Sequence, residues 1–380
     1  MTILERDLEA VLAVVAGRAE AQAERRQLDD EVVAAIASSG LNRSLLPAAL
    51  GGSERHPGEV VEVVAQIAAV DGSTGWCSAI GAGSNVFAGY MDEGAARTSF
   101  DDPDAGGASV FAPMGVVQVA GDGKATLSGR WAFASNSVHG QWTGLGAFVV
   151  GADGVRDPIP RLVFVPGKDL TIEDTWHGSG LRATGSHHVR LDAAPVDLDR
   201  SCTFADRAWP EGPLWRMPLF TILAPVLAAA PLGIARGAID DLQRQVIAGD
   251  AGASRGRLHD DPVGLAELAA ADSALRAAHA GLLDVVDRVW QEAVAGRRAS
   301  GALQARTILA VGHASDIAVD ATAVAHRLYG GASAYVGHRG LTALRDVETA
   351  RQHALFGHSH RPTLMRISAG SSEIAPPLVI

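Results

Sequence analysis

Residues Ser128–Trp142 read SGRWAFASNSVHGQW, and the rest of the chain is organised around this stretch. The alternating residues before it and the apolar run after it are typical of β-strands. Two aromatic residues, Trp131 and Phe133, lead into a cluster of small polar residues: Ser135, Asn136 and Ser137. A flat apolar surface beside short hydrogen-bond donors suits a planar heterocycle such as a flavin ring. An ordinary β-hairpin with aromatic core residues is the simpler interpretation of this stretch alone.

The hydrophobic period changes on either side of this stretch. Apolar residues recur at helical spacing before residue 107, and short strand-like runs separated by Gly, Asp and Pro turns follow, a pattern typical of a small β-barrel or sandwich. Long amphipathic segments come last and predict an antiparallel bundle: 219–248, 261–295, 301–328 and 341–356. We therefore expect an α+β fold with three domains: a helical domain 1–106, a β-barrel 107–208 and a helical bundle 209–380.

Composition limits the possible partners. The 380 residues carry a formal net charge of -11, which argues against a nucleic-acid or anionic-membrane partner. Cys77 and Cys202 have no nearby Cys partner, so we expect neither a disulfide framework nor a zinc site. The first residues, MTILERDLEAVL, carry acids where a signal peptide carries bases, and we expect no apolar run long enough to span a bilayer. These features favour a cytoplasmic protein without a bound metal.

Several short motifs occur in a fixed order along the whole chain. They are Asp71–Trp76 (DGSTGW), Phe111–Pro113 (FAP), Ser128–Ser135 (SGRWAFAS), Gly180–Ser186 (GLRATGS), Arg345-Asp346 and Gln352-His353. In this order and spacing the sequence resembles the acyl-CoA dehydrogenase superfamily. It resembles most closely the oxygen-using branch, the reduced-flavin-dependent monooxygenases of two-component systems. The resemblance implies an N-terminal α-helical domain, a middle β-barrel and a C-terminal four-helix bundle, with the flavin between barrel and bundle.

The resemblance also implies which residues bind the cofactor. Those that would line the flavin ring are Phe111, Trp131, Phe133, Ala134 and Ser135, with Trp176 near it and Thr184 or Ser186 anchoring the neighbouring loop. Arg255 lies where relatives place an arginine on the cofactor phosphate of a neighbouring subunit, which suits guanidinium geometry. Arg257 is the close alternative, and a solvated loop arginine is the third. Such clamping across subunits implies a homotetramer.

The last part of the chain separates a dehydrogenase from an oxygenase. An acyl-CoA dehydrogenase needs a carboxylate base, but the count from Arg345-Asp346 falls on Ala354, and a second registration of the tail falls on Ala369. The oxygenase branch places a histidine here, and His353 is present. The resemblance thus implies a monooxygenase that takes reduced FMN or FAD from a separate NAD(P)H:flavin reductase and uses O2, through a C4a-hydroperoxyflavin, to oxygenate a small organic substrate. An FAD-dependent acyl-CoA dehydrogenase with a relocated base and a non-catalytic flavin-binding relative are the alternatives.

His353 and Ser135 are the expected catalytic residues. We expect His353 on the last helix, facing the flavin edge, where an imidazole with a pKa near 6.5 can donate a hydrogen bond or exchange a proton. A surface cluster with His358 and His360, or a metal site, are the alternatives. Ser84 and Asn85 are the expected substrate-binding residues. They lie where phenol-hydroxylating relatives carry a second histidine, which makes a phenol less favoured than an amino group, a sulfur centre or a polycyclic carbon.

Overall fold

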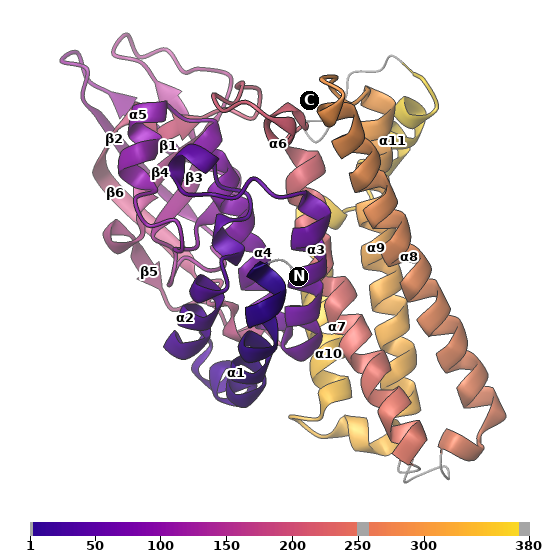
Figure 1. Ribbon diagram of the computed structural model, residues 1–380. Helices are drawn as coiled ribbons and strands as arrows, with labels where there is room; N and C mark the ends of the chain where they lie inside the picture. The colour runs from indigo at the N-terminus through magenta and orange to yellow at the C-terminus, as the bar shows by residue number, and fades with distance from the viewer. Residues whose placement is uncertain (1–2, 249–257, 372–380) are drawn as a thin grey trace.

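The computed structural model describes residues 3–248 and 258–371, and Figure 1 shows a sheet on one side of the molecule and long helices on the other. The N-terminal third is helical. Its helices are α1 (Ile3–Arg25), α2 (Asp30–Ser38), α3 (Pro57–Val70), α4 (Gly72–Asn85) and α5 (Glu93–Ser99). Asp71 separates α3 from α4, because its carboxylate accepts the backbone N–H of Thr74 at 2.8 Å and caps the new helix.

Seven strands follow and form one mixed sheet in the order β5-β6-β2-β1-β3-β4-β7. They are β1 (Ala108–Val119), β2 (Ala125–Trp131), β3 (Trp142–Val150), β4 (Arg161–Pro166), β5 (Thr171–Glu173), β6 (His188–Val196) and β7 (Ser201–Cys202). The α+β class is confirmed, but the expected closed barrel is not found. Among the described residues no ladder joins β5 to β7, and these two edge strands span only three and two residues. The sheet is therefore open.

The stretch 132–141 is not the turn of a β-hairpin. β2 and β3, the strands on either side of it, do not pair with each other, because β1 lies between them, antiparallel to β2 and parallel to β3. The stretch therefore crosses the end of β1. Phe133 and Asn136 have left-handed backbone angles, with φ of 60° and 64°, which turn the chain sharply twice. The hairpin interpretation is thus wrong.

The C-terminal part is a helical bundle. Its helices are α6 (Pro213–Arg216), α7 (Phe220–Ala248), α8 (Pro262–Val294), α9 (Gly301–Leu328), α10 (Arg339–Arg351) and α11 (Arg361–Ser368). The fourth long helix is shorter than expected, because α10 ends at Arg351 and a 3-10 turn, Ala354–Phe356, follows. His353 lies between them in an extended conformation, so its placement on the last helix is corrected.

Two large hydrophobic cores and a small cluster of Leu28, Cys77 and Ala183 hold these layers. One joins the N-terminal helices to the bundle, since α3 and α4 pack on α7, and it includes Val64, Trp76, Ile234 and Phe356. The other lies within the sheet and includes Val117, Trp131, Leu145 and Val163. The first core also includes Trp142, Leu162 and Phe164 of β3 and β4, so it packs one face of the sheet against the helices, and the polar stretch 132–141 lies at this seam.

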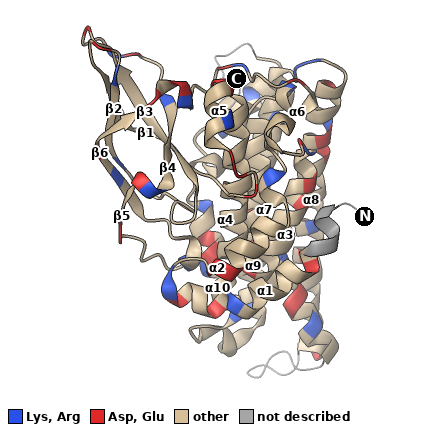
Figure 2. Cartoon of the chain, turned by 60° about the vertical axis from the view of Figure 1, so that its left-hand side comes forward, with Lys and Arg blue, Asp and Glu red and all other residues tan. Residues whose placement is uncertain are grey.

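The bundle helices are unusually apolar. By length and composition α7 and α9 could each cross a membrane, contrary to our expectation, although 94% and 56% of their most apolar windows are buried inside the fold. Central helices of soluble proteins have the same property. Basic and acidic residues are interspersed over the outer elements in Figure 2.

Candidate functional site

A chain of buried hydroxyl groups marks the seam between sheet and helices. Ser135 Oγ lies 2.7 Å from Ser186 Oγ, which lies 2.6 Å from Thr184 Oγ1. Thr184 donates to the carbonyl of Leu181 at 2.9 Å, and Trp76 Nε1 of α4 donates to Ser135 Oγ at 3.1 Å. The three predicted hydroxyl residues are therefore in direct contact, although Ser135 is about fifty residues from the other two in the sequence.

Phe133 is the exposed aromatic residue of this seam. Its side chain is 68% exposed although Trp131 and Ala134 nearby are buried, and its backbone has the left-handed φ of 60°. The ring meets Trp176 edge-on at 6.4 Å and His188 at 5.8 Å between centroids. Trp176 is itself fixed by a hydrogen bond from its indole N–H to Leu181 O at 3.0 Å. A non-glycine residue in this conformation costs free energy, and here it presents an aromatic ring to open space.

His353 reaches the same seam from the bundle side. Its ring meets the Trp76 indole edge-on at 5.7 Å, so a continuous path leads from His353 through Trp76 to Ser135. His353 Nδ1 accepts the backbone N–H of Leu355 at 3.3 Å, which leaves Nε2 as the protonated nitrogen of a neutral ring. The residue is half-buried, and the protein packed around the imidazole lowers its pKa to about 4. The expectation of an ordinary pKa near 6.5 is therefore corrected.

A pair of carboxyl groups joins the bundle to the loop of Leu181. Asp346 of α10 is 6% exposed, and its Oδ1 accepts the backbone N–H of Leu181 at 2.6 Å. Burial, and next the nearby Asp71, raise the pKa of Asp346 to about 7, and burial raises the pKa of Asp71 as well. Gly180 packs on the same helix, where a Cβ would lie 2.0 Å from the carbonyl oxygen of Arg345. Sequence reasoning noted both aspartates in motifs but did not bring them together.

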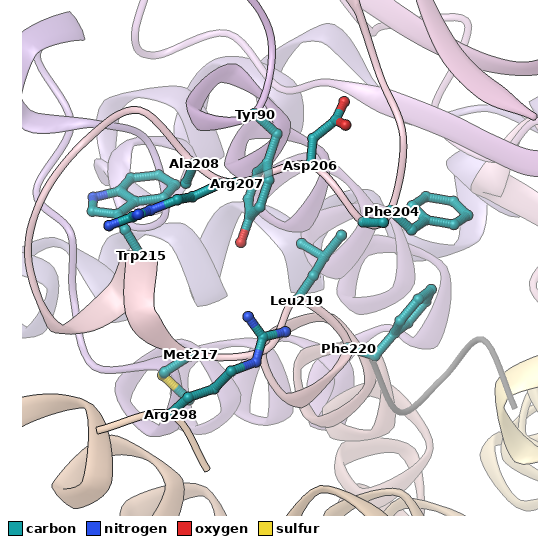
Figure 3. Close-up of a pocket in the computed structure, with 11 residues that line it drawn as sticks. Tyr90, Phe204, Asp206, Arg207, Ala208, Trp215, Met217, Leu219, Phe220 and Arg298 are labelled. Carbon is teal, nitrogen blue, oxygen red and sulfur yellow. The ribbon is translucent and has the colours of Figure 1, made fainter. Parts of the chain in front are cut away.

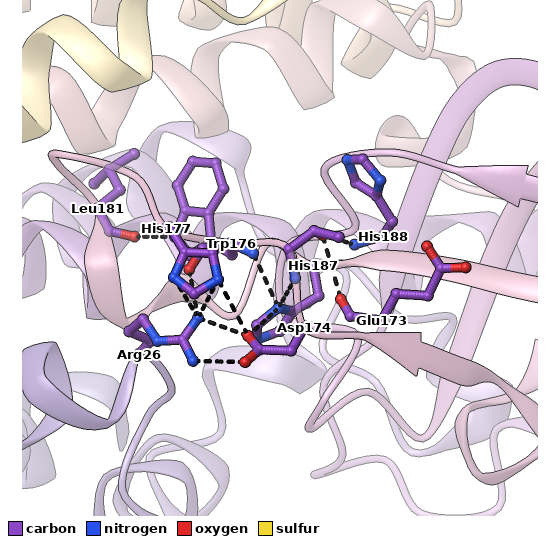
Figure 4. Close-up of polar contacts among 9 residues, drawn as sticks. Arg26, Glu173, Asp174, Trp176, His177, Leu181, His187 and His188 are labelled. Atoms are coloured by element: carbon purple, nitrogen blue, oxygen red, sulfur yellow. Dashed lines mark hydrogen bonds and ion pairs between the residues drawn. The ribbon is translucent and has the colours of Figure 1, made fainter.

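The other end of this loop is held by charges (Figure 4). Asp174 accepts two hydrogen bonds from the Arg26 guanidinium, at 2.6 and 2.9 Å, and the same guanidinium donates to Trp176 O at 2.9 Å. His187 Nδ1 accepts the backbone N–H groups of Thr175 and Trp176, both at 3.2 Å. The loop that carries Trp176, Thr184 and Ser186 is thus fixed at both ends.

Two residues predicted to line the flavin belong to the sheet core. Trp131 is fully buried, and its indole N–H donates to Gly146 O at 2.8 Å. Ala134 is 1% exposed, and its backbone N–H and carbonyl bind His187 O and Ser137 N. Both side chains are buried in this core, and their contact with a flavin stays a prediction. Trp131 is the last residue of β2 and packs into the sheet core, whereas Phe133 lies beyond the strand end, where the left-handed backbone turns it outward.

The remaining predicted residues have mixed outcomes. Ser84 Oγ lies 2.9 Å from Ser109 Oγ of β1, which joins α4 to the sheet. Asn85 donates both amide hydrogens to the carbonyls of Asn42 and Ala105, and its contact with substrate stays a prediction. Phe111 packs among Phe87, Phe204 and Phe220.

Arg255 and its alternative Arg257 lie outside the described residues. Within the described ranges no cluster of three or more His, Cys, Asp or Glu side chains could hold a metal.

Comparisons with known proteins match this arrangement. The family described as Acyl-CoA dehydrogenase, C-terminal domain, matches residues 225–358. The oxygenase subunit HsaA of the flavin-dependent monooxygenase of Rhodococcus jostii (strain RHA1) is 32% identical over 282 residues, which cover 71% of this chain and 73% of the relative. This chain belongs to the flavin-dependent monooxygenases with an acyl-CoA dehydrogenase fold.

Other flavin-dependent monooxygenases are also similar to this chain in sequence or structure. The indole-3-acetate monooxygenase of Pseudomonas putida is 29% identical over 338 residues, which cover 88% of this chain and 85% of the relative. XiaF from Streptomyces sp., solved in complex with FADH2 and glycerol, has a TM-score of 0.91 and 27% identity, over 98% of this chain and 96% of XiaF. The protein is therefore an oxidoreductase that uses reduced flavin for oxygenation. These oxygenases do not support the alternative of an acyl-CoA dehydrogenase.

Proposed function

We propose that the flavin ring lies against Phe133 and Trp176, with its polar edge at the hydroxyl chain of Ser135, Ser186 and Thr184. The exposed, left-handed Phe133 is the observation that carries this proposal, because an apolar ring held in a strained conformation beside buried hydroxyl groups offers a planar heterocycle both a stacking face and hydrogen-bond partners. The residues present therefore fit a flavin. When bound, the reduced flavin supplies the electrons that activate O2.

Side chains around the proposed flavin position would hold the ring and orient the substrate beside it. Thr184 donates to Leu181 O, so Ser186 donates to Thr184 and Ser135 donates to Ser186, while Trp76 donates to Ser135. Every hydroxyl hydrogen is therefore used, and the chain offers a ligand acceptor lone pairs. His353 stays neutral at pH 7 and offers Nε2–H as a hydrogen-bond donor at the reacting edge. Ser84, paired with Ser109, orients the substrate on the α4 side.

The partners belong to the same proposal. The similarity to an oxygenase subunit and to an indole-3-acetate monooxygenase supports a separate NAD(P)H:flavin reductase and a small aromatic substrate. We also propose a homotetramer, a phosphate contact by Arg255 or Arg257, a cytoplasmic location without nucleic acid or membrane partners, and the three domains 1–106, 107–208 and 209–380. FMN and FAD both remain compatible with the residues that would meet the ring.

The first prediction concerns oxygen use. Purified protein supplied with reduced FMN or FADH2 by a separate reductase should consume O2 faster than the free flavin does, and an aromatic substrate should convert that consumption into product. The measurement is oxygen uptake together with hydrogen peroxide and product. Uptake at the free-flavin rate for both flavins, over a panel of arenes, would refute the oxygenase and leave a non-catalytic flavin-binding protein.

A second prediction tests the flavin face. Phe133→Ala keeps a non-glycine residue at the left-handed φ but removes the ring, so we expect reduced-flavin affinity to fall about tenfold, the effect of about 1.4 kcal/mol of lost aromatic contact. Anaerobic titration of flavin fluorescence measures it. Val155→Ala is the matched control, because Val155 is also an exposed apolar residue (65%) but lies in the turn between β3 and β4. Equal affinities in the two variants would remove Phe133 from the flavin site.

A further inference from the structure

His188, the first residue of β6, lies beside the exposed ring of Phe133. The two ring centroids are 5.8 Å apart, and the ring planes meet at 87°. The backbone N–H of His188 donates to Thr175 Oγ1 at 2.8 Å, which fixes the start of the strand. In Figure 4 the imidazole points away from the ion pair of Arg26 and Asp174 that holds the neighbouring loop. The backbone of His188 is therefore held, and its ring is left for another partner.

The two ring nitrogens of His188 have different surroundings. Nδ1 is covered by protein and has no hydrogen-bond partner, and Nε2, which is not covered, has none either among residues 3–248 and 258–371. A proton on Nδ1 would be a buried donor without an acceptor, which costs free energy, so the ring carries its proton on Nε2. The residue therefore presents one N–H donor at its open side.

Strand alternation places this donor on the side of the sheet that faces the helices. Val189, the next residue of β6, belongs to the core within the sheet, so His188 projects from the opposite face. On β4, Leu162 and Phe164 also project away from the sheet core, and they pack in the core that includes the helices. Near His188 that face is open enough to leave Phe133 68% exposed. A ring bound on Phe133 is therefore within reach of this histidine.

The hydroxyl chain beside Phe133 offers a flavin only acceptors, because all of its hydrogens are donated within the protein. A flavin ring has N–H groups that such acceptors can bind, but it also carries carbonyl oxygens, which need donors. The backbone N–H of Ala134 donates to His187 O at 2.9 Å, so the residues that precede Ser135 and His188 are in direct contact. His188 therefore lies at the same seam and supplies the kind of group that the hydroxyl chain lacks.

We propose that His188 is a further flavin-binding residue, whose Nε2–H donates to a carbonyl oxygen of the ring that lies against Phe133 and Trp176. The inference rests on the proposed function, because it takes the position of the ring from it. Reduction adds negative charge to the part of the ring that carries the carbonyl groups, and a hydrogen bond to a charged acceptor is the stronger one. The donor therefore favours reduced flavin over oxidised flavin.

Calorimetric titration of the flavin-free, full-length protein with oxidised FMN and FAD, and anaerobically with their reduced forms, tests this assignment. His188→Leu removes the donor and keeps much of the volume. We expect its affinity to fall at least about tenfold for reduced flavin and about fivefold or less for oxidised flavin, the effect of one hydrogen bond to a charged or a neutral acceptor. His188→Gln, whose side-chain amide can place an N–H near the position of Nε2, should restore most of the loss.

The stability of the flavin-free protein separates binding from folding. His188→Leu removes a buried nitrogen that has no partner, so the free energy of unfolding should not fall. Chemical denaturation measures it. A marked loss of stability in this variant would show that the imidazole is a packing residue and would overturn the assignment.

Two controls locate the effect. His177→Leu removes a neighbouring histidine that is 65% exposed and lies 3.2 Å from the Arg26 guanidinium, so the ratio of reduced to oxidised affinity should not change. A cavity of about 160 Å³ lies between α6, the start of α7 and the connection that follows β7, and the Tyr90 hydroxyl points into it (Figure 3). Its lining shares no residue with the proposed flavin face, so Tyr90→Phe should leave both affinities unchanged.

Failure of this inference is distinct from failure of the oxygenase. Equal losses for reduced and oxidised flavin in His188→Leu, or no recovery in His188→Gln, would overturn the donor even if the parent protein oxygenates its substrate. A loss in Tyr90→Phe as large as that in His188→Leu would overturn both the donor and the proposed position of the ring. A selective loss of reduced-flavin affinity, together with oxygen uptake at the free-flavin rate in the parent protein, would uphold His188 and refute the oxygenase.

Discussion

His353→Ala should make the enzyme release most of the oxygen it consumes as hydrogen peroxide. The imidazole reaches the seam through its edge contact with Trp76, and its Nε2–H is the donor that the Leu355 hydrogen bond leaves available. Removing one preorganised donor from a reacting site costs about a hundredfold or more in rate. We therefore expect product per oxygen consumed to fall at least about tenfold, while flavin binding changes little.

The control for this variant is another nearby histidine. His358 is exposed and lies 3.6 Å from Asp316, outside the Trp76 path, so His358→Ala should leave coupling unchanged. Peroxide and product are measured in the same reaction. Unchanged coupling in His353→Ala, or an equal loss in His358→Ala, would remove His353 from the mechanism.

The depressed pKa of His353 sharpens this prediction. Because burial lowers its pKa to about 4, the imidazole remains neutral throughout the physiological range, and its hydrogen-bond donor does not titrate there. Coupling should therefore be flat between about pH 6 and about pH 8 as far as His353 is concerned, in contrast to a histidine with an ordinary pKa of about 6.5. A loss of coupling centred near pH 6.5 that disappears in His353→Gln would contradict the neutral donor.

Asp346 should give the largest effect on stability, with opposite signs in two variants. Asp346→Leu removes the acceptor of the buried Leu181 N–H, which costs about 1–3 kcal/mol and loosens the loop that holds Trp176. Asp346→Asn keeps an acceptor for Leu181 and replaces the second oxygen by a donor that can meet Asp71. It should therefore stabilise the protein at neutral pH.

The pH dependence follows from the raised pKa. Asp346 is protonated in the folded protein up to a pKa of about 7, against an ordinary value of 3.8, so the unfolded chain releases this proton first as the pH rises. The stability from this group is present at low pH and is lost as the pH rises from about 4 to about 7. The loss is on the order of 4 kcal/mol, because each unit of pKa is worth about 1.4 kcal/mol.

Chemical denaturation at several pH values checks both variants. Asp346→Asn should exceed the parent protein in free energy of unfolding at about pH 8, with the difference shrinking toward about pH 4 as the parent carboxyl becomes neutral in both states. Glu348→Gln, on the same helix α10, is the control, and its difference from the parent should lack this pH dependence. An Asn variant less stable than the parent at every pH would show that the carboxyl is not a buried, uncharged group.

Much of the architecture could be predicted from residue patterns. Helical spacing around Val60 and Val64, the cap at Asp71, and the runs that became α7 to α9 are local signals, and the matching helices were found. Strand-like runs were also predicted within the region of β1 to β4, although β1 was expected as two separate runs. The closure of the sheet could not be predicted in this way, because it depends on whether β5 and β7, at opposite edges, pair with each other.

The sequence by itself determined most of the long helices, the strand-rich middle region, their order, the family, and the residue types of the candidate site. Only the tertiary structure decided which of these residues meet. It buried Trp131 in the sheet core and left Phe133 exposed to solvent. It joined Ser135 to Ser186 and Trp76 through hydrogen bonds. It also brought Asp71 beside Asp346 from elements far apart in the chain. The physical reason is that periodicity reports which face of one element is buried, whereas contacts and pKa values depend on the neighbours and the solvent that packing supplies.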